Sequence, residues 1–194
     1  MKLHYGGRYK DEKDLKVFGE SHEGEVAFRE HDQKKFALIA NAGSAVLVAA
    51  LLVPVFLFGT FGTELILRIC VGSMLSLLII LPHEFLHALC FKGDVYLYYD
   101  PSKMIAFVHG AESMSKARFI FMSLLPNIVF GVIPYVLFLF IHDLTVLGAF
   151  GAVCIGMGFG DYVNVFNAAT QMPKGAKTFL KGFHSYWYLP KKGE

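Results

Sequence analysis

Two histidines and a glutamate stand within five residues of one another, in the sequence His83-Glu84-Phe85-Leu86-His87. In a helix, residues four positions apart lie on one face, so the two imidazoles could hold one metal ion between them. A glutamate directly after the first histidine could then accept a proton from water at that metal. The HExxH spacing therefore predicts a zinc (Zn²⁺) site with His83 and His87 as ligands and Glu84 as the general base.

The motif lies inside an apolar run, where ionisable side chains are costly and are by default functional. A second interpretation is a helix end at a membrane interface with both histidines in water, because Lys92 follows only five residues after His87. Cys90 is a further candidate ligand, although a free cysteine more often acts as a small buried apolar residue. Pro82, directly before the motif, is expected to kink the helix and to admit water to the metal.

A catalytic zinc usually takes three protein ligands, and we expect Asp161 to be the third. His83 comes 15 residues after Arg68, and Asp161 comes 18 residues after Asp143. We expect the two apolar runs that contain them to cross a membrane in the same direction. At about 1.5 Å per residue, His83 and Asp161 lie at similar depths, roughly 23 and 27 Å from the outer end of each run. The alternative is a buried aspartate that hydrogen-bonds to a neighbouring helix. The glycines of Gly158-Phe159-Gly160 would let this segment approach the HExxH helix closely.

Three asparagines are candidates for holding a substrate or orienting a ligand: Asn127, Asn164 and Asn167. Asn164 and Asn167 follow Asp161 at steps of three, on much the same helical face, although such asparagines more often mark a helix end. Asn127 comes directly after Pro126 in another apolar run. Its amide could donate to an oxyanion or a peptide, or it could bridge two helices.

The rest of the chain must supply the elements that position these residues. Of its 194 residues, 55% are hydrophobic and 18% are charged, against about 45–50% and about 25% in ordinary soluble domains. This composition excludes a disordered chain, a coiled coil and a small disulfide scaffold. Four apolar runs are long enough to cross about 30 Å of hydrocarbon as helices, namely residues 36–58, 65–91, 119–141 and 144–167. We therefore expect an α-helical integral membrane protein with about four transmembrane helices.

The positive charges predict the orientation of these helices. All Lys and Arg residues except Arg68 lie in three segments, namely residues 1–35, 92–118 and 168–194. By the positive-inside rule, the N-terminal arm, the 92–118 loop and the C-terminal tail are cytoplasmic, and residues 36–167 form the membrane domain. The first apolar run begins after 35 mostly polar residues, so it is expected to be an anchor and not a cleaved signal. A net charge of +2 argues against a nucleic-acid partner.

Little regular structure is expected outside the spans. Val95–Tyr99 and Met104–Val108 favour strands, and the intervening Asp100–Lys103 favours a turn, which together predict a small cytoplasmic β-hairpin. Glu25–Arg29 could be one strand or part of a disordered arm. Phe183–Lys192 mixes aromatic residues with lysines and could be an interfacial anchor or a solvated tail. The three cysteines lie in apolar runs, and no disulfide is expected.

An HExxH motif in a membrane helix, a hairpin-like loop and a later span with an intramembrane aspartate resemble the site-2 protease type of intramembrane zinc metalloprotease. More closely, the chain resembles the small bacterial membrane proteins grouped as a putative zincin peptidase family. The resemblance covers roughly residues 25–170 and includes a Gly-Asp-x-x-Asn element, here Gly160 to Asn164. It implies a bacterial cytoplasmic-membrane protein. The site-2 type implies His83, His87 and Asp161 as ligands and Glu84 as the base.

The chain departs from the site-2 type at the aspartate. There the aspartate usually stands in a Leu-Asp-Gly context, whereas here Gly160 precedes Asp161 and Tyr162 follows it. The leading hypothesis is a zinc-dependent endopeptidase that cleaves a membrane protein or peptide near the cytoplasmic face of the lipid bilayer. In this hypothesis the hairpin offers an edge strand to an extended substrate. The alternatives are a small metal-ion or proton transporter and a structural zinc-binding membrane subunit.

Overall fold

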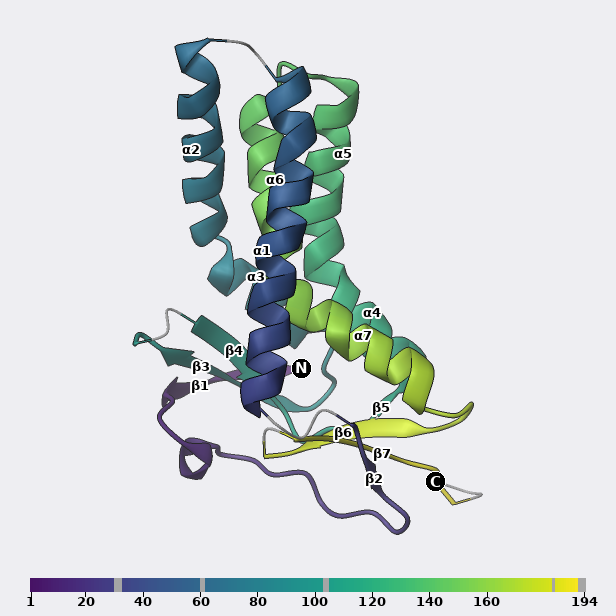
Figure 1. Cartoon of the computed structure of the whole chain (residues 1–194). Coiled ribbons are helices and arrows are strands. Elements are labelled where there is room, and N and C mark those ends of the chain that lie inside the picture. The colour runs from purple at the N-terminus through teal and green to yellow at the C-terminus, as the bar shows by residue number, and fades with distance from the viewer. Residues whose placement is uncertain (30–32, 60–61, 103–104, 183, 192–194) are drawn as a thin grey trace. The chain divides into compact units, whose positions relative to one another are not determined.

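The computed structural model describes residues 1–29, 33–59, 62–102, 105–182 and 184–191 (Figure 1). The helical elements are η1 (Glu12–Asp14), α1 (Gln33–Phe58), α2 (Thr63–Leu77), α3 (Ile80–Leu89), α4 (Lys116–Pro126), the π-helical η2 (Asn127–Val132), α5 (Ile133–Phe140), α6 (Thr145–Met157) and α7 (Phe159–Gln171). The strands are β1 (Lys2–Arg8), β2 (Val26–Ala27), β3 (Asp94–Asp100), β4 (Ile105–His109), β5 (Met114–Ser115), β6 (Lys177–Lys181) and β7 (His184–Tyr188). The chain divides into two compact units, one of residues 34–83 and 124–163 and one of residues 1–33, 84–123 and 164–194.

The unit of residues 34–83 and 124–163 is helical. Helix α6 packs against both α2 and α5, and the core between them contains Ile69, Phe138 and Ala149. A Cβ at Gly151 would lie 2.7 Å from the backbone nitrogen of Tyr135, so this close contact requires glycine. The hydroxyl of Tyr135 also donates to a carbonyl of α1, and the helices therefore meet through small residues and a polar bridge as well as through apolar packing.

Length and composition single out two helical runs that could each cross a membrane, Lys34–Phe58 and Lys116–Phe140. The other two predicted spans are not single helices. Helices α2 and α3 meet at a bend of 46°, and α6 and α7 meet at a bend of 49°, so up to four crossings result if each bent pair counts as one. The 65–91 and 144–167 runs therefore correspond to broken helices, and the second of these breaks was not predicted from the sequence.

The bend between α2 and α3 has a local cause. A proline removes one helical N–H and its ring clashes with the carbonyl four residues earlier, which here is the carbonyl of Leu78. Helix α2 ends at Leu77, directly before Leu78. The backbone N–H of His83 resumes the helical pattern by donating to the carbonyl of Ile79 at 2.7 Å. The kink expected from Pro82 thus falls one turn before the proline, and α3 starts the HExxH motif in its first turns.

The second unit contains two sheets. In the first, β3 lies between β1 and β4, and β3 and β4 form the antiparallel hairpin that the sequence predicts. Lys103 and Met104 of the predicted turn and strand lie outside the described residues. Strand β1, which was not predicted, runs parallel to β3, with a register shift at Gly7, whose φ of 98° suits glycine.

The second sheet has the order β2-β7-β6-β5 (Figure 1). Its two central strands come from residues 168–194, which were expected to be a solvated or interfacial tail. Thr178 and Phe179 of β6 and Tyr188 of β7 are buried, so this segment forms part of the unit's interior. Phe183 and Lys192 of the expected anchor lie outside the described residues. Val26–Ala27, within the predicted single strand of the N-terminal arm, pairs with β7.

The core of this unit joins its helical and β segments. Ala88 of α3, Phe119 of α4 and Ala168 of α7 are buried in one cluster with Val95 of β3 and Met114 of β5. The last turns of the HExxH helix therefore pack in the same core as the strands.

Candidate metal centre

Helix α3 brings the HExxH side chains together. One ligand atom from each of His83, Glu84 and His87 lies within 4.8 Å of those of the other two. His87 is buried, and the other two side chains are partly buried. A four-residue step in a helix therefore has the expected result, with two imidazoles on one face and a carboxylate beside them.

The ring of His87 is oriented by a backbone group of α4. Its Nδ1 lies 2.9 Å from the carbonyl oxygen of Met122. A carbonyl can only accept, so Nδ1 carries the proton and Nε2 carries the lone pair that binds a metal. Metal-binding histidines are commonly held this way, with the second nitrogen donating to a carbonyl.

Asp161 lies next to the first histidine. Its Oδ2 is 3.3 Å from Nε2 of His83, although the two residues are 78 positions apart. Both side chains are only 16% exposed. Asp161 occupies the first turn of α7, directly after the bend, where the positive end of the helix dipole favours a carboxylate. The break between α6 and α7 therefore stabilises the charge of this side chain.

Asn127 holds the same carboxylate from a third segment. Its Nδ2 donates to Oδ2 of Asp161 at 2.8 Å, and the asparagine itself is buried. A Cβ on Gly158 would collide with the amide group of Asn127. Gly158 is thus needed for the approach of Asn127. A Cβ on Gly160 would meet only the ring of Phe36, at 3.7 Å.

Glu84 faces the edge of the hairpin. Its Oε2 accepts a hydrogen bond of 2.9 Å from the backbone N–H of Val108 in β4. Strand β4 is at the edge of its sheet, so this N–H points away from β3. The proposed general base therefore lies beside a strand edge that carries main-chain hydrogen-bonding groups.

One pair of the candidate donors has the spacing of zinc ligands. Ligands about 2.0–2.1 Å from a tetrahedral zinc lie about 3.3–3.4 Å from one another. The 3.3 Å between His83 Nε2 and Asp161 Oδ2 agrees with this spacing. Two imidazole nitrogens and one carboxylate oxygen are also a donor set that zinc readily accepts.

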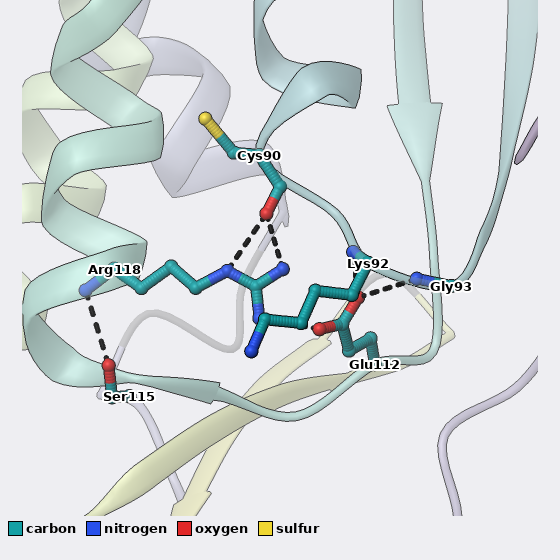
Figure 2. A network of polar contacts seen from close by, with 6 residues as sticks. All are labelled: Cys90, Lys92, Gly93, Glu112, Ser115 and Arg118. Atoms are coloured by element: carbon teal, nitrogen blue, oxygen red, sulfur yellow. Dashed lines mark hydrogen bonds and ion pairs between the residues drawn. The ribbon is translucent and has the colours of Figure 1, made fainter. Parts of the chain in front are cut away.

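A polar network fixes the end of the HExxH helix (Figure 2). The guanidinium of Arg118 donates to the carbonyl of Cys90 through Nε, at 2.8 Å, and through Nη2. Arg118 also pairs with Glu112 at 2.5 Å, and Glu112 accepts from the backbone N–H groups of Lys92 and Gly93 at 2.6 and 3.1 Å. These contacts connect the start of α4 to the segment that follows α3.

This network also sets the ionisation of Glu112. Burial raises the pKa of its carboxyl group, but the Arg118 side chain and the two backbone N–H groups outweigh that effect and hold the pKa below its ordinary value of 4.5. Glu112 is therefore ionised and engaged, and it is not available as the ligand that an HExxH site would still need.

Residues 76–177 match the model of a protein family described as putative zincin peptidase, and this stretch is more than half of the chain. The chain belongs to this family. Zincins are zinc metallopeptidases that carry HExxH on a helix, so membership supports zinc as the metal and metallopeptidase as the general class. No match was found among the curated proteins or among the solved structures.

The segment matched to the zincin family contains the whole candidate centre but not strands β1, β2 and β7. Two predicted site residues, Asn164 and Asn167, have other surroundings in the hydrogen-bond network. Asn167 is buried and accepts a hydrogen bond from Gln171 at 2.9 Å. Within the described part of the chain, neither Asn164 nor Asn167 makes a hydrogen bond to a candidate ligand. The thiol of Cys90 contacts the carbonyl of Leu86 in the preceding helix α3, which gives no support to a role as ligand.

One group that contacts a candidate ligand was not predicted from the sequence. The Met122 carbonyl belongs to the backbone, and residue type gives no direct sign of it. The available signal was Pro126, because a proline removes the N–H that an α-helix directs at the carbonyl four residues earlier.

Proposed function

We propose that this zincin is a membrane-embedded, zinc-dependent endopeptidase that hydrolyses a peptide bond of a membrane-associated substrate near the cytoplasmic face. The observation that carries the proposal is the 3.3 Å between His83 Nε2 and Asp161 Oδ2. It unites an HExxH histidine with a carboxylate from a distant apolar run at the spacing of two zinc ligands.

In this proposal, Nε2 of His83, Nε2 of His87 and a carboxylate oxygen of Asp161 would hold the metal. Zinc bound there would supply Lewis-acid polarisation of a water molecule and of the scissile carbonyl. The Met122 carbonyl keeps the His87 ring in the tautomer that offers Nε2, and Asn127 keeps Oδ2 of Asp161 in place.

Glu84 is the proposed general base. Its carboxylate takes the proton of the attacking water and then passes it to the nitrogen of the leaving amine, so that the peptide bond breaks with no net change in the charge of the residue. Helix α3 holds Glu84 next to both histidines, as this role requires.

We further propose that an extended substrate pairs with β4. Val108 presents its N–H outward to Glu84, which indicates that this edge carries main-chain groups beside the base. Strand addition at such an edge would align a substrate backbone along the strand, and an extended backbone exposes its amides to attack. Asn127 points to Asp161, so we assign it to the orientation of that ligand and not to an oxyanion.

The membrane setting is also a proposal. Two apolar helical runs of 25 residues and two bent pairs have the length and composition of crossings. The distribution of Lys and Arg favours a cytoplasmic location for both described ends of the chain and for the hairpin. The combination of HExxH and a later aspartate supports a likeness to site-2 proteases, and the bacterial cytoplasmic membrane is the setting we propose.

The first experiment measures zinc in the detergent-purified protein by elemental mass spectrometry. We expect about one zinc per chain in the wild type and in Glu84→Gln, and a large loss in His87→Ala and Asp161→Ala. Zinc that survives Asp161→Ala would overturn the ligand set. No zinc in the reconstituted wild type would favour the helix-end interpretation of HExxH.

A second experiment tests catalysis without a known substrate. Bacterial cells producing the wild type or Glu84→Gln are compared for new N-termini in membrane proteins, by mass spectrometry of their terminal peptides. The proposal predicts termini that occur with the wild type alone. Identical sets of termini, with zinc still bound to both proteins, would instead favour a transporter or a structural zinc protein.

A further inference from the structure

Pro126 stands four residues after Met122, whose carbonyl accepts from Nδ1 of His87. In an uninterrupted α-helix, the carbonyl of residue 122 would accept from the N–H of residue 126. A proline has no N–H, so the Met122 carbonyl lacks this helical donor. Met122, whose carbonyl contacts the candidate ligand His87, is therefore the residue that loses its helical hydrogen-bond donor because of Pro126.

This arrangement matters in a buried setting. Pro126 is fully buried and His87 is buried, so water is a poor substitute donor at this point of α4. Helices that contain proline are tolerated in apolar surroundings when another group satisfies the released carbonyl. At 2.9 Å, the imidazole N–H of His87 supplies that donor.

We propose that Pro126 is a positioning residue for His87. It reserves the Met122 carbonyl for Nδ1–H and thereby fixes the tautomer in which Nε2 carries the metal-binding lone pair. The next residue, Asn127, donates to Asp161, so one Pro-Asn pair would orient two of the three proposed ligands. The inference rests on the metal centre of the proposed function and does not require that the protein be a peptidase.

The test variant is Pro126→Ala, which restores an N–H at position 126. Alanine is the best helix former, so this variant should fold. The helical N–H now competes for the Met122 carbonyl, and we expect His87 to populate both tautomers. The measurement is the ¹⁵N spectrum of histidine-labelled, metal-free protein, in which the His87 signals are those that disappear in His87→Asn. Zinc affinity, measured by competition with a chelator, should fall about 10-fold.

Two controls separate the N–H from other effects of the substitution. Pro134→Ala restores an N–H elsewhere in the same span and should change neither readout. An α-hydroxy analogue of alanine at position 126 lacks the N–H as proline does but has no ring, and it should restore the wild-type tautomer and affinity.

Wild-type spectra and affinity in Pro126→Ala would overturn the inference, and so would an α-hydroxy variant that behaves like Pro126→Ala. Because the tautomer is read without metal, the outcome is independent of the proposed function. A wild type that binds no zinc contradicts the function, whereas an unchanged tautomer contradicts the role of Pro126.

Discussion

The Oδ2 atom of Asp161 contacts two side chains, Nε2 of His83 and Nδ2 of Asn127. A carboxylate that an amide already holds loses less freedom when it binds a metal, so the metal-free site is organised in advance. This explains why a buried asparagine is found beside the candidate ligand Asp161. Sequence reasoning included Asn127 among three candidates, but its partner became clear only from the structure.

Replacing Asn127 tests this organisation. Asn127→Ala removes the donor to Asp161 and should weaken zinc affinity about 10–100-fold, as is typical when a group that orients a ligand is lost. Asn164→Ala is the matched control, because Asn164 makes no hydrogen bond to a candidate ligand in the described chain, and its affinity should match the wild type. Both are measured by chelator competition. Equal affinities in the two variants would contradict the role of Asn127.

Gly158 and Gly160 offer a second comparison at this scale. Gly158→Ala places a methyl group against the amide of Asn127 and should displace it from Asp161, with a loss of zinc affinity of about 10-fold or more. Gly160→Ala meets only an ordinary contact with Phe36 and should keep its affinity while stabilising α7 slightly. The measurement is again zinc competition, together with thermal unfolding. Equal losses in both variants would count against this explanation.

At the scale of elements, the two bends bring candidate ligands to the starts of helices. Helix α3 begins three residues before His83, and α7 begins two residues before Asp161. Both residues could be identified as candidates from the sequence, because HExxH is a specific pattern and Asp161 interrupts an apolar run. The break at Gly158 could not, because apolarity reports whether a segment crosses a membrane and is insensitive to a bend within it.

Some of the strands could likewise be predicted from the sequence, and others could not. The hairpin was predictable because β-favouring residues flank a clear turn around Pro101. Strand β1 contains Gly6 and Gly7, which weaken any strand signal, yet a side chain at Gly6 would clash with the ring of Tyr98. Residues 177–188 mix lysines and aromatics, and that composition describes an interfacial anchor as well as a pair of strands. Only the pairing with distant partners decides between them.

The network around Glu112 predicts a pH effect on this unit. Because the folded pKa of Glu112 lies below 4.5, its stabilisation is present above that value and is lost as the pH falls through the folded pKa. At pH 7, Glu112→Gln should lower the free energy of unfolding by about 1.5–3 kcal/mol, since it removes hydrogen bonds to a charged group. It should also lose less stability than the wild type between about pH 7 and 3.5, as measured by thermal unfolding in detergent.

The control is Glu64→Gln. Glu64 pairs with Arg68 at 3.2 Å, but its side chain is 69% exposed, so solvent screens this ion pair. This variant should unfold almost as the wild type does. If Glu112→Gln and Glu64→Gln unfold at the same temperature, the network in Figure 2 contributes little to stability.

At the scale of the whole molecule, the distribution of Lys and Arg makes a prediction about sidedness. We expect the turn at Asp143 to face away from the cytoplasm and the segment at Lys174 to face it. In a variant without the three native cysteines, Asp143→Cys should react with a membrane-impermeant maleimide in intact cells, and Lys174→Cys only after lysis. The reverse pattern of labelling would overturn the proposed orientation.

The sheet of β2, β7, β6 and β5 has a consequence for the order of synthesis. Val26 pairs with Trp187, so the first and last strands of this sheet to be synthesised are neighbours. A ribosome makes every apolar run before it makes β7, and the unit that contains Glu84 therefore cannot close until residues 184–188 have emerged. If the chain is the membrane peptidase proposed above, its active unit would stay incomplete during insertion, which would spare the nascent chain and its insertion machinery from premature cleavage.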